Sequence, residues 1–356
     1  PHERAGPLPS AHPEVRSTEG SPVSAIDWAT ALPVVFMALM GVAMLAYVVL
    51  DGYDLGTGLL LHRATPAQRD TMIASIGPFW DANETWLVLG VGILLIAFPK
   101  AHGLVLTALY LPVTLMLVGL VLRGVAFDFR VKAQDEWKPL WNFAFWAGSG
   151  IAATAQGWML GRYITGFAEG WVATAFAGAI ALLLPAAYVL LGACWLVMKT
   201  EGELQAHAVR WAKRAWAPVV LGMGLVSIAT PLVSATVRER WFSMPEFIAL
   251  LPIPLVTLAA LVAARAMLNS KQVMGRLCWL PFVAVVAVFV FGAIGLAYSL
   301  FPYVVMDRLT IWDAASATSS LAVIAIGCAI TVPTIVGYTI YSYRVFGGKV
   351  KELSYA

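Results

Sequence analysis

The sequence predicts an all-α polytopic membrane protein, and two observations carry this prediction. Of its 356 residues, 60% are hydrophobic and 12% are charged, and the mean hydropathy is +0.80. Soluble domains carry about 25% charged residues, so this composition excludes a soluble protein. In addition, apolar runs of about 20 residues, the length that crosses a bilayer, follow one another with short connections between them.

The apolar runs predict nine transmembrane helices. Short loops favour antiparallel neighbours, and we expect two four-helix bundles plus one peripheral helix in a single domain, residues 28–346. Residues 1–27 are rich in proline and lack an apolar period, which predicts a disordered tail without a signal peptide. Residues 347–356 are expected to be a short cytoplasmic tail. The expected spans are 28–61, 78–98, 102–123, 140–162, 171–198, 214–236, 246–268, 277–301 and 317–343.

The lysines and arginines predict the orientation. Of the 23 basic residues, 16 fall in the connections on the side of the C-terminus and 7 on the side of the N-terminus. Cytoplasmic loops carry the excess of positive charge, so we expect the N-terminus outside and the C-terminus in the cytoplasm.

The inner end of the first helix carries two acids within residues 50–58, Leu-Asp-Gly-Tyr-Asp-Leu-Gly-Thr-Gly. Asp51 and Asp54 share one helix face, while Gly52 and Gly56 form a small-xxx-small pair that lets another helix approach closely. An Asp-Gly turn ending the helix at residue 50 would instead leave both acids in solvent. The leucines that follow continue the apolar pattern, which favours buried acids.

The second helix begins with the segment around which the chain is organised, Gly77–Trp86. The apolar run Trp86–Phe98 is too short to span alone, whereas a helix starting at Pro78 would have 21 residues. Asp81 would then lie one turn inside the helix and Glu84 about two, on one face. Because carboxylates inside a membrane are costly, we expect them to face a protein interior or a water path and to be functional.

The end of the third helix provides basic residues at the same face as these acids. Arg123 and Arg130 flank Asp128 in the sequence Arg-Gly-Val-Ala-Phe-Asp-Phe-Arg and are candidate counter-charges. The alternative, contact with lipid headgroups under the positive-inside rule, is favoured for either arginine taken alone.

The sequence offers no evident cofactor site. None of the five histidines lies at mid-membrane, and methionines in apolar helices are nearly always packing residues, so no haem is expected on this chain. Phosphate loops and histidine metal motifs are missing from the sequence, and the three cysteines lie apart in apolar runs. No nucleic-acid partner is indicated.

The motifs resemble those of subunit II of the cytochrome bd-type quinol oxidases, including the cyanide-insensitive branch. The resemblance covers about residues 30–346. It departs from the usual pattern at residues 82–84, which are Ala-Asn-Glu where many members have Gly-Asn-Gln, so Glu84 is an additional acid. The matching stretches, in the expected order, are 51–58, 78–86, 123–130, 301–303 and 310–316.

This resemblance implies a heterodimer in the bacterial inner membrane. The partner, subunit I, would carry haems b558, b595 and d and the quinol site, and the complex would oxidise quinol and reduce oxygen to water. Some members hold a structural quinone in this subunit, and a small single-helix accessory subunit is a further expected partner.

The resemblance also assigns roles to individual residues. It associates Asp81 with a proton path to haem d and Trp86 with oxygen access from the bilayer; we add Asp51, Asp54 and Glu84 to the predicted path because they cluster at the same face. The remaining motif residues are expected to be structural: Gly52, Gly56, Pro78, Trp80, Asn83, Arg123, Asp128, Arg130, Trp312 and Asp313.

Two other classes of function fit part of the pattern. A proton-coupled transporter would also use intramembrane acids and helices broken at glycine. However, the sequence shows no clear inverted repeat, and its acids lie near one face rather than at the midplane. A purely structural partner that shields a haem subunit from lipid is the third hypothesis, and it predicts that Asp81 is dispensable.

Overall fold

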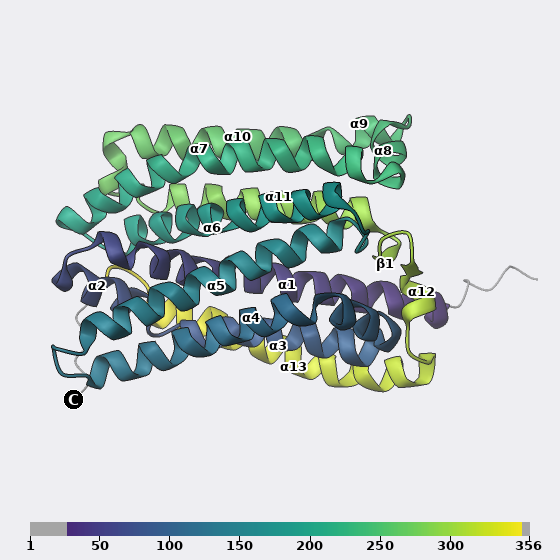
Figure 1. Ribbon diagram of the computed structural model, residues 1–356, viewed down its shortest axis with the longest axis horizontal. Coiled ribbons are helices and arrows are strands. Elements are labelled where there is room, and N and C mark those ends of the chain that lie inside the picture. The colour runs from purple at the N-terminus through teal and green to yellow at the C-terminus, as the bar shows by residue number, and fades with distance from the viewer. Residues whose placement is uncertain (1–26, 351–356) are drawn as a thin grey trace, which may run out of the picture.

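The structure, a computed structural model, describes residues 27–350. Nearly all of this part of the chain is helical, and its long helices run side by side along one axis (Figure 1). The predicted disordered tail lies outside the described residues, apart from Asp27. The long helices are α1 (Trp28–Leu60), α3 (Trp80–Ala97), α4 (Pro99–Lys132), α5 (Lys138–Ile164), α6 (Trp171–Lys199), α7 (Gly202–Val233), α10 (Pro252–Asn269), α11 (Leu280–Leu300) and α13 (Thr318–Val345).

Eight helices of the described chain are long and apolar enough to cross a membrane, which confirms a polytopic helical protein. The remaining long helix, α5, coincides with the predicted span 140–162 but is not among the eight. Its many glycines, its tryptophans and the polar Asn142 and Gln156 lower its hydropathy. It nevertheless packs between α4 and α6 along the same axis (Figure 1).

Two helices extend well beyond the predicted spans. α4 continues from residue 123 to Lys132, and α7 begins at Gly202 rather than at residue 214. In both extensions, polar and charged residues alternate with apolar ones. Hydropathy therefore detected the apolar part of each helix and not the part that projects toward water.

A further short helix, α2 (Pro66–Ile76), occupies a segment that the sequence analysis treated as a connection. Thr65 and Gln68 form a capping box, in which the Thr65 side chain accepts from the Gln68 N–H and the Gln68 side chain accepts from the Thr65 N–H. Pro66 is at the first helical position. The pattern Thr-Pro-Ala-Gln is a sequence signal for a helix start, and it could have identified α2.

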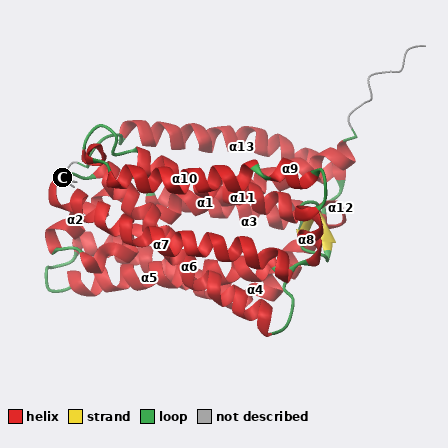
Figure 2. Cartoon of the chain, turned by 90° about the horizontal axis from the view of Figure 1, so that it is seen from above, coloured by secondary structure: helices red, strands yellow, loops and turns green. Residues whose placement is uncertain are grey.

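The two ends of the helical body differ (Figure 2). One end holds α2 and the last described residues. The other holds the beginning of α1 and several short elements: α8 (Ala235–Phe242), α9 (Glu246–Leu250), α12 (Ile311–Ala314) and the antiparallel pair β1 (Tyr303–Val305) and β2 (Leu309–Thr310), in which Tyr303 is opposite Thr310. The described chain ends are thus at opposite ends of the body.

Helix α1 is at the centre of the packing, in contact with α3, α5, α6, α11 and α13. Its glycines allow the close approach of α6. A Cβ added at Gly56 would overlap the backbone carbonyl of Tyr188, and one added at Gly192 would lie 2.5 Å from the Thr57 nitrogen. The predicted small-xxx-small contact of α1 is therefore confirmed, and α6 is its partner.

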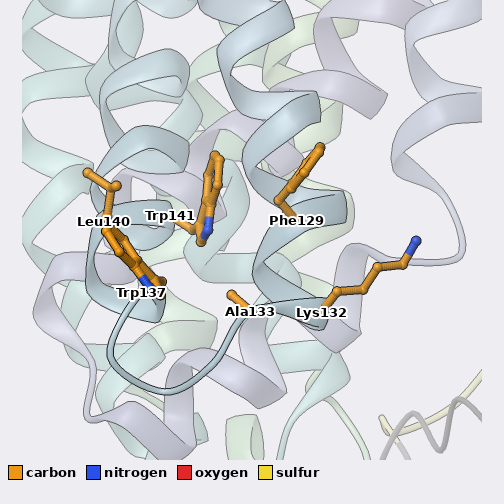
Figure 3. A pocket seen from close by; sticks show the side chains of 6 residues that line it. All are labelled: Phe129, Lys132, Ala133, Trp137, Leu140 and Trp141. Atoms are coloured by element: carbon orange, nitrogen blue, oxygen red, sulfur yellow. The ribbon is translucent and has the colours of Figure 1, made fainter.

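An aromatic groove lies where α4 ends and α5 begins. Figure 3 shows its lining, with Trp137 and Trp141 on one side of the groove and Phe129 on the other. The Trp141 and Phe129 rings stack with their centroids 5.3 Å apart, and the Lys132 ammonium points away from them. Amphipathic indoles beside a lysine at a helix end are typical of the aromatic belt at a membrane interface.

Candidate functional site: a buried acid–arginine cluster

The inner end of α1 carries its two acids into the protein interior. The helix continues unbroken through residues 51–58, and Asp51 and Asp54 are both 0% exposed. The prediction of buried acids is confirmed, and the alternative of a solvated Asp-Gly turn is wrong. The reason is that residues 51–58 are enclosed by α3, α5 and α6.

Arg123 of α4 supplies the counter-charge. Its side chain is 1% exposed, its Nη2 atom lies 2.6 Å from Asp51 Oδ1, and it also donates to Glu84 Oε1 of α3. The interpretation that Arg123 contacts lipid headgroups is therefore wrong. An arginine fits this position because its planar guanidinium can engage two carboxylates at once.

Asn83 connects α3 to the second acid of α1. It is 1% exposed, and its Nδ2 atom donates to Asp54 Oδ2 at 2.8 Å. The same nitrogen lies 3.2 Å from the Leu50 carbonyl and 2.8 Å from Tyr53 Oη. Residues from α1, α3 and α4 thus form one cluster, with Arg123 beside Asp51 and Asn83 beside Asp54.

The start of α3 differs from the prediction. Gly77, Pro78 and Phe79 form a turn after α2, and the helix begins at Trp80. Its length is 18 residues, or about 27 Å at 1.5 Å per residue, which is still close to the thickness of the hydrocarbon core. Asp81 consequently lies in the first turn and is exposed on this chain, not one turn inside a buried face.

Glu84 lies just over one turn into α3, between Asp81 and the buried acids of the cluster. Its side chain is 28% exposed, and it reaches Arg123 from the side of the helix that is less covered. The two acids of the predicted common face therefore differ in exposure: Asp81 is exposed and Glu84 is partly buried. Beyond Arg123 lie the fully buried Asp51 and Asp54.

Several buried polar atoms of the cluster have no hydrogen-bond partner among the described residues. They are both carboxylate oxygens of Asp51, of which Oδ1 is ion-paired with Arg123, and Asp54 Oδ1, Thr57 Oγ1, Arg123 Nε and Arg123 Nη1. Buried polar groups are usually hydrogen-bonded to protein or to ordered water. The cluster is therefore polar enough to be hydrated, and one arginine faces three carboxyl groups within it.

A second polar network, which the sequence analysis missed, links α1, α5 and α6. Gln156 Nε2 donates to Tyr47 Oη at 2.8 Å, and Tyr188 Oη donates to Gln156 Oε1 at 2.6 Å. Tyr47 lies one helical turn before Asp51, so this network adjoins the acid cluster. The signal available in the sequence was Gln156, an isolated amide in a helix of small and apolar residues.

Trp86 is packed inside the chain. It is 5% exposed and forms a small cluster with Ala43 and Tyr47 of α1. Its ring nitrogen is buried with no hydrogen-bond partner among residues 27–350. The Trp86 indole is thus packed at the contact between α1 and α3, close to Tyr47.

Arg130, the second candidate counter-charge, is also not a headgroup contact on this chain. Its Nη2 lies 2.6 Å from Asp70 Oδ1 of α2, and its Nε donates to Asn142 Oδ1 at 2.5 Å. Asp128, between the two arginines, is exposed. Arg130 therefore ties α2 to α4 and α5, apart from the acid cluster.

The other predicted structural residues hold helix ends. The Trp80 ring lies 5.0 Å from the Phe127 ring, which joins the start of α3 to α4. At the opposite end of the protein, Trp312 Nε1 donates to the Thr30 carbonyl at 3.2 Å, and Asp313 Oδ2 accepts from Thr310 Oγ1 at 2.5 Å. Neither Trp312 nor Asp313 is part of the acid cluster.

The donor set of the cluster fits protons and water better than a metal or haem. Its acids are paired with arginine and amide donors, and within residues 27–350 no three His, Cys, Asp or Glu side chains are placed to hold a metal ion. The described histidines are at helix ends or on α7, at residues 62, 102 and 207. That haem is bound by a partner chain stays a prediction.

Residues 32–346 match the family described as cytochrome bd terminal oxidase subunit II. The chain is 26% identical to cytochrome bd ubiquinol oxidase subunit 2 of Bacillus subtilis, over 88% of this chain and 95% of that protein. It is also 26% identical to cytochrome bd-I ubiquinol oxidase subunit 2 of Escherichia coli, over 89% of this chain and 95% of that protein. The fold resembles a chain of the bd oxidase from Geobacillus thermodenitrificans, with a TM-score of 0.70, 18% identity, and coverage of 88% of this chain and 98% of that one. Because the family match spans nearly all of the described helices, the chain belongs to the cytochrome bd terminal oxidase subunit II family.

Proposed function

We propose that this chain is the haem-free membrane subunit of a quinol:oxygen oxidoreductase, in which it stabilises the haem-bearing subunit and gives protons access to it. The observation that carries the proposal is the buried cluster of Asp51, Asp54 and Arg123 inside a chain of this family. Such costly intramembrane charges normally serve a function.

The proposed proton route runs from the exposed Asp81 past Glu84 to the buried acids Asp51 and Asp54. Its support is the graded burial along α3 and the unpartnered oxygens of the two buried acids, which ordered water would satisfy. Arg123 would keep the carboxylates charged by compensating them, and a proton could be held where three acids face a single arginine.

We also propose the composition of the complete complex. Subunit I would hold haems b558, b595 and d and the quinol site, this chain would add nine spanning helices arranged as two four-helix bundles plus one peripheral helix, and α5 would be the ninth span. Quinol and oxygen are the proposed substrates of the complex, in a bacterial inner membrane. A structural quinone and a small single-helix subunit are further proposed components.

Purification of the complex tests the proposal directly. A tag on this chain is expected to retain a haem-bearing partner with absorption in the far red and quinol-dependent oxygen consumption, while the chain expressed alone shows no haem spectrum. A transporter would be recovered without such a partner. A haem spectrum from the isolated chain that disappears on mutating one of its own residues, such as His102 or Met44, would contradict the assignment of the haems to subunit I.

The orientation is proposed to be N-terminus outside and C-terminus cytoplasmic, because basic residues favour the cytoplasmic side. Single cysteines at Asp135 and Glu169, which are exposed in loops at opposite ends of the body, test it in a background without native cysteines. Glu169→Cys should react with an impermeant thiol reagent in intact cells. Asp135→Cys should react only after the membrane is opened, and the reverse pattern would invert the topology.

Trp86 is proposed to line a lateral apolar path for oxygen, which partitions into lipid. Trp86→Ala is then expected to change the apparent KM for oxygen while the KM for quinol is unchanged, because the indole is part of the wall between α1 and α3. Trp171→Ala is the matched control, since that tryptophan is exposed on α6. Unchanged oxygen kinetics in an intact Trp86→Ala complex would leave Trp86 with a packing role alone.

A further inference from the structure

The inner end of α13 contacts the acid cluster, although this helix buries only Leu321 and Ser342 in the described part of the chain. Tyr343, near its end, is half-buried. Its hydroxyl lies 2.5 Å from Tyr53 Oη and 3.3 Å from Asn83 Oδ1. The last helix thus reaches a residue that donates directly to Asp54.

The three side chains form a closed ring of hydrogen bonds. Asn83 Nδ2 donates to Tyr53 Oη at 2.8 Å, so the Tyr53 proton is available for Tyr343. The Tyr343 proton is in turn available for Asn83 Oδ1. Each hydroxyl then has one acceptor. The second proton on Asn83 Nδ2 is directed to Asp54 Oδ2 at 2.8 Å, and the Leu50 carbonyl, at 3.2 Å, is the more distant acceptor of the same nitrogen.

The ring determines which way the Asn83 amide points. An amide rotated by half a turn would place its oxygen against the Asp54 carboxylate, and two acceptors cannot bond each other. Tyr343 supports the orientation that Asp54 favours, because its hydroxyl supplies the donor that the amide oxygen needs while the amide nitrogen donates to Asp54. We propose that Tyr343 is a positioning residue that fixes the Asn83 amide so that it donates to Asp54.

The C-terminal segment holds Tyr343 in place. The Tyr343 ring stacks on Phe79 with centroids 4.5 Å apart. Beyond it, Lys199 Nζ donates to the Phe346 carbonyl at 2.7 Å, and the Val350 N–H donates to the Lys199 carbonyl at 2.8 Å. Residues 347–350 of the expected tail therefore lie against the end of α6 and clamp the end of α13.

This inference rests on the proposed function, since it concerns an acid of the proposed proton route. Tyr343→Phe in the assembled complex removes one hydroxyl and keeps the stacked ring. We expect kcat for quinol-dependent oxygen consumption, expressed per haem, to fall about 3- to 10-fold, the effect of one lost hydrogen bond. The KM for quinol should not change, and the solvent deuterium isotope effect on kcat should increase.

Tyr341→Phe is the matched control, because Tyr341 is exposed on the same helix. It should leave kcat and the isotope effect unchanged. Tyr53→Phe breaks the same ring from α1 and should reproduce the effect of Tyr343→Phe, and the double variant should fall no further than either single variant.

The outcomes separate this inference from the proposed function. Slow turnover in Asp54→Asn with normal turnover and a normal isotope effect in Tyr343→Phe would overturn the inference and leave the proton route intact. Normal turnover in Asp54→Asn would overturn both. Failure of the complex to assemble with either Tyr343→Phe or Tyr53→Phe would assign the ring to folding and also overturn the inference.

Discussion

Replacing Arg123 with alanine is expected to cost about 3–5 kcal/mol of stability, the typical loss when one partner is removed from a buried ion pair. Arg123 Nη2 lies 2.6 Å from Asp51, which is 0% exposed and would be left without a counter-charge among the described residues. The measurement is the temperature at which the purified complex loses its haem spectrum. This midpoint should fall sharply, or the complex should fail to accumulate.

Two further variants test whether the loss of stability comes from the buried charge of Arg123. Arg130→Ala removes an arginine from the same helix, but its partner Asp70 is 58% exposed, so the loss should be smaller. Arg123→Met combined with Asp51→Asn removes both charges and should recover part of the stability lost by the single variant. An equal loss in the double and the single variant would show that Arg123 acts through packing and not through its charge.

The acids of α1 could be predicted from the sequence because the relevant signals are local. The leucines after Asp54 continue the helical pattern, and Gly52 and Gly56 mark the face that α6 approaches. The start of α3 could not be predicted in the same way. Pro78 is compatible with a helix start or with a turn, and the preceding α2, which ends at Ile76, makes it a turn.

The partners of the buried acids depend on contacts between distant segments. An arginine near the end of an apolar run looks the same in the sequence whether its side chain faces lipid headgroups or a buried acid. In the structure α4 continues past Arg123 to Lys132, and the Arg123 side chain points into the protein against Asp51. Similarly, no local pattern connects Tyr343 to Asn83, which is 260 residues earlier in the chain. Hydropathy predicts that a helix exists, but not which of its polar residues meet those of another helix.

The sequence predicted a role for Asp81 in proton transfer because it placed this acid one turn inside a spanning helix. In the structure the acid is exposed instead, so a role in proton transfer needs a different physical reason. Asp81 is exposed at the start of α3, and the residue at the helix cap is Phe79, with no side-chain capping bond. An exposed acid one turn from Glu84 is placed to exchange protons between water and the buried cluster. An acid in the first turn also interacts favourably with the helix dipole, but that contribution is only about 0.3–1 kcal/mol.

Asp81→Asn is therefore expected to leave assembly and the haem spectrum of the partner intact while slowing oxygen consumption by about a hundredfold, the lower end of what positioned proton-transfer groups contribute. Asparagine keeps the size of the side chain but cannot carry a proton, and Asp81→Glu should retain more activity. Asp135→Asn is the control, because that acid is exposed in the loop after α4 at the same end of the protein. A purely structural subunit predicts unchanged turnover in all three variants, and wild-type turnover in a fully assembled Asp81→Asn complex would reject the proton route through this residue.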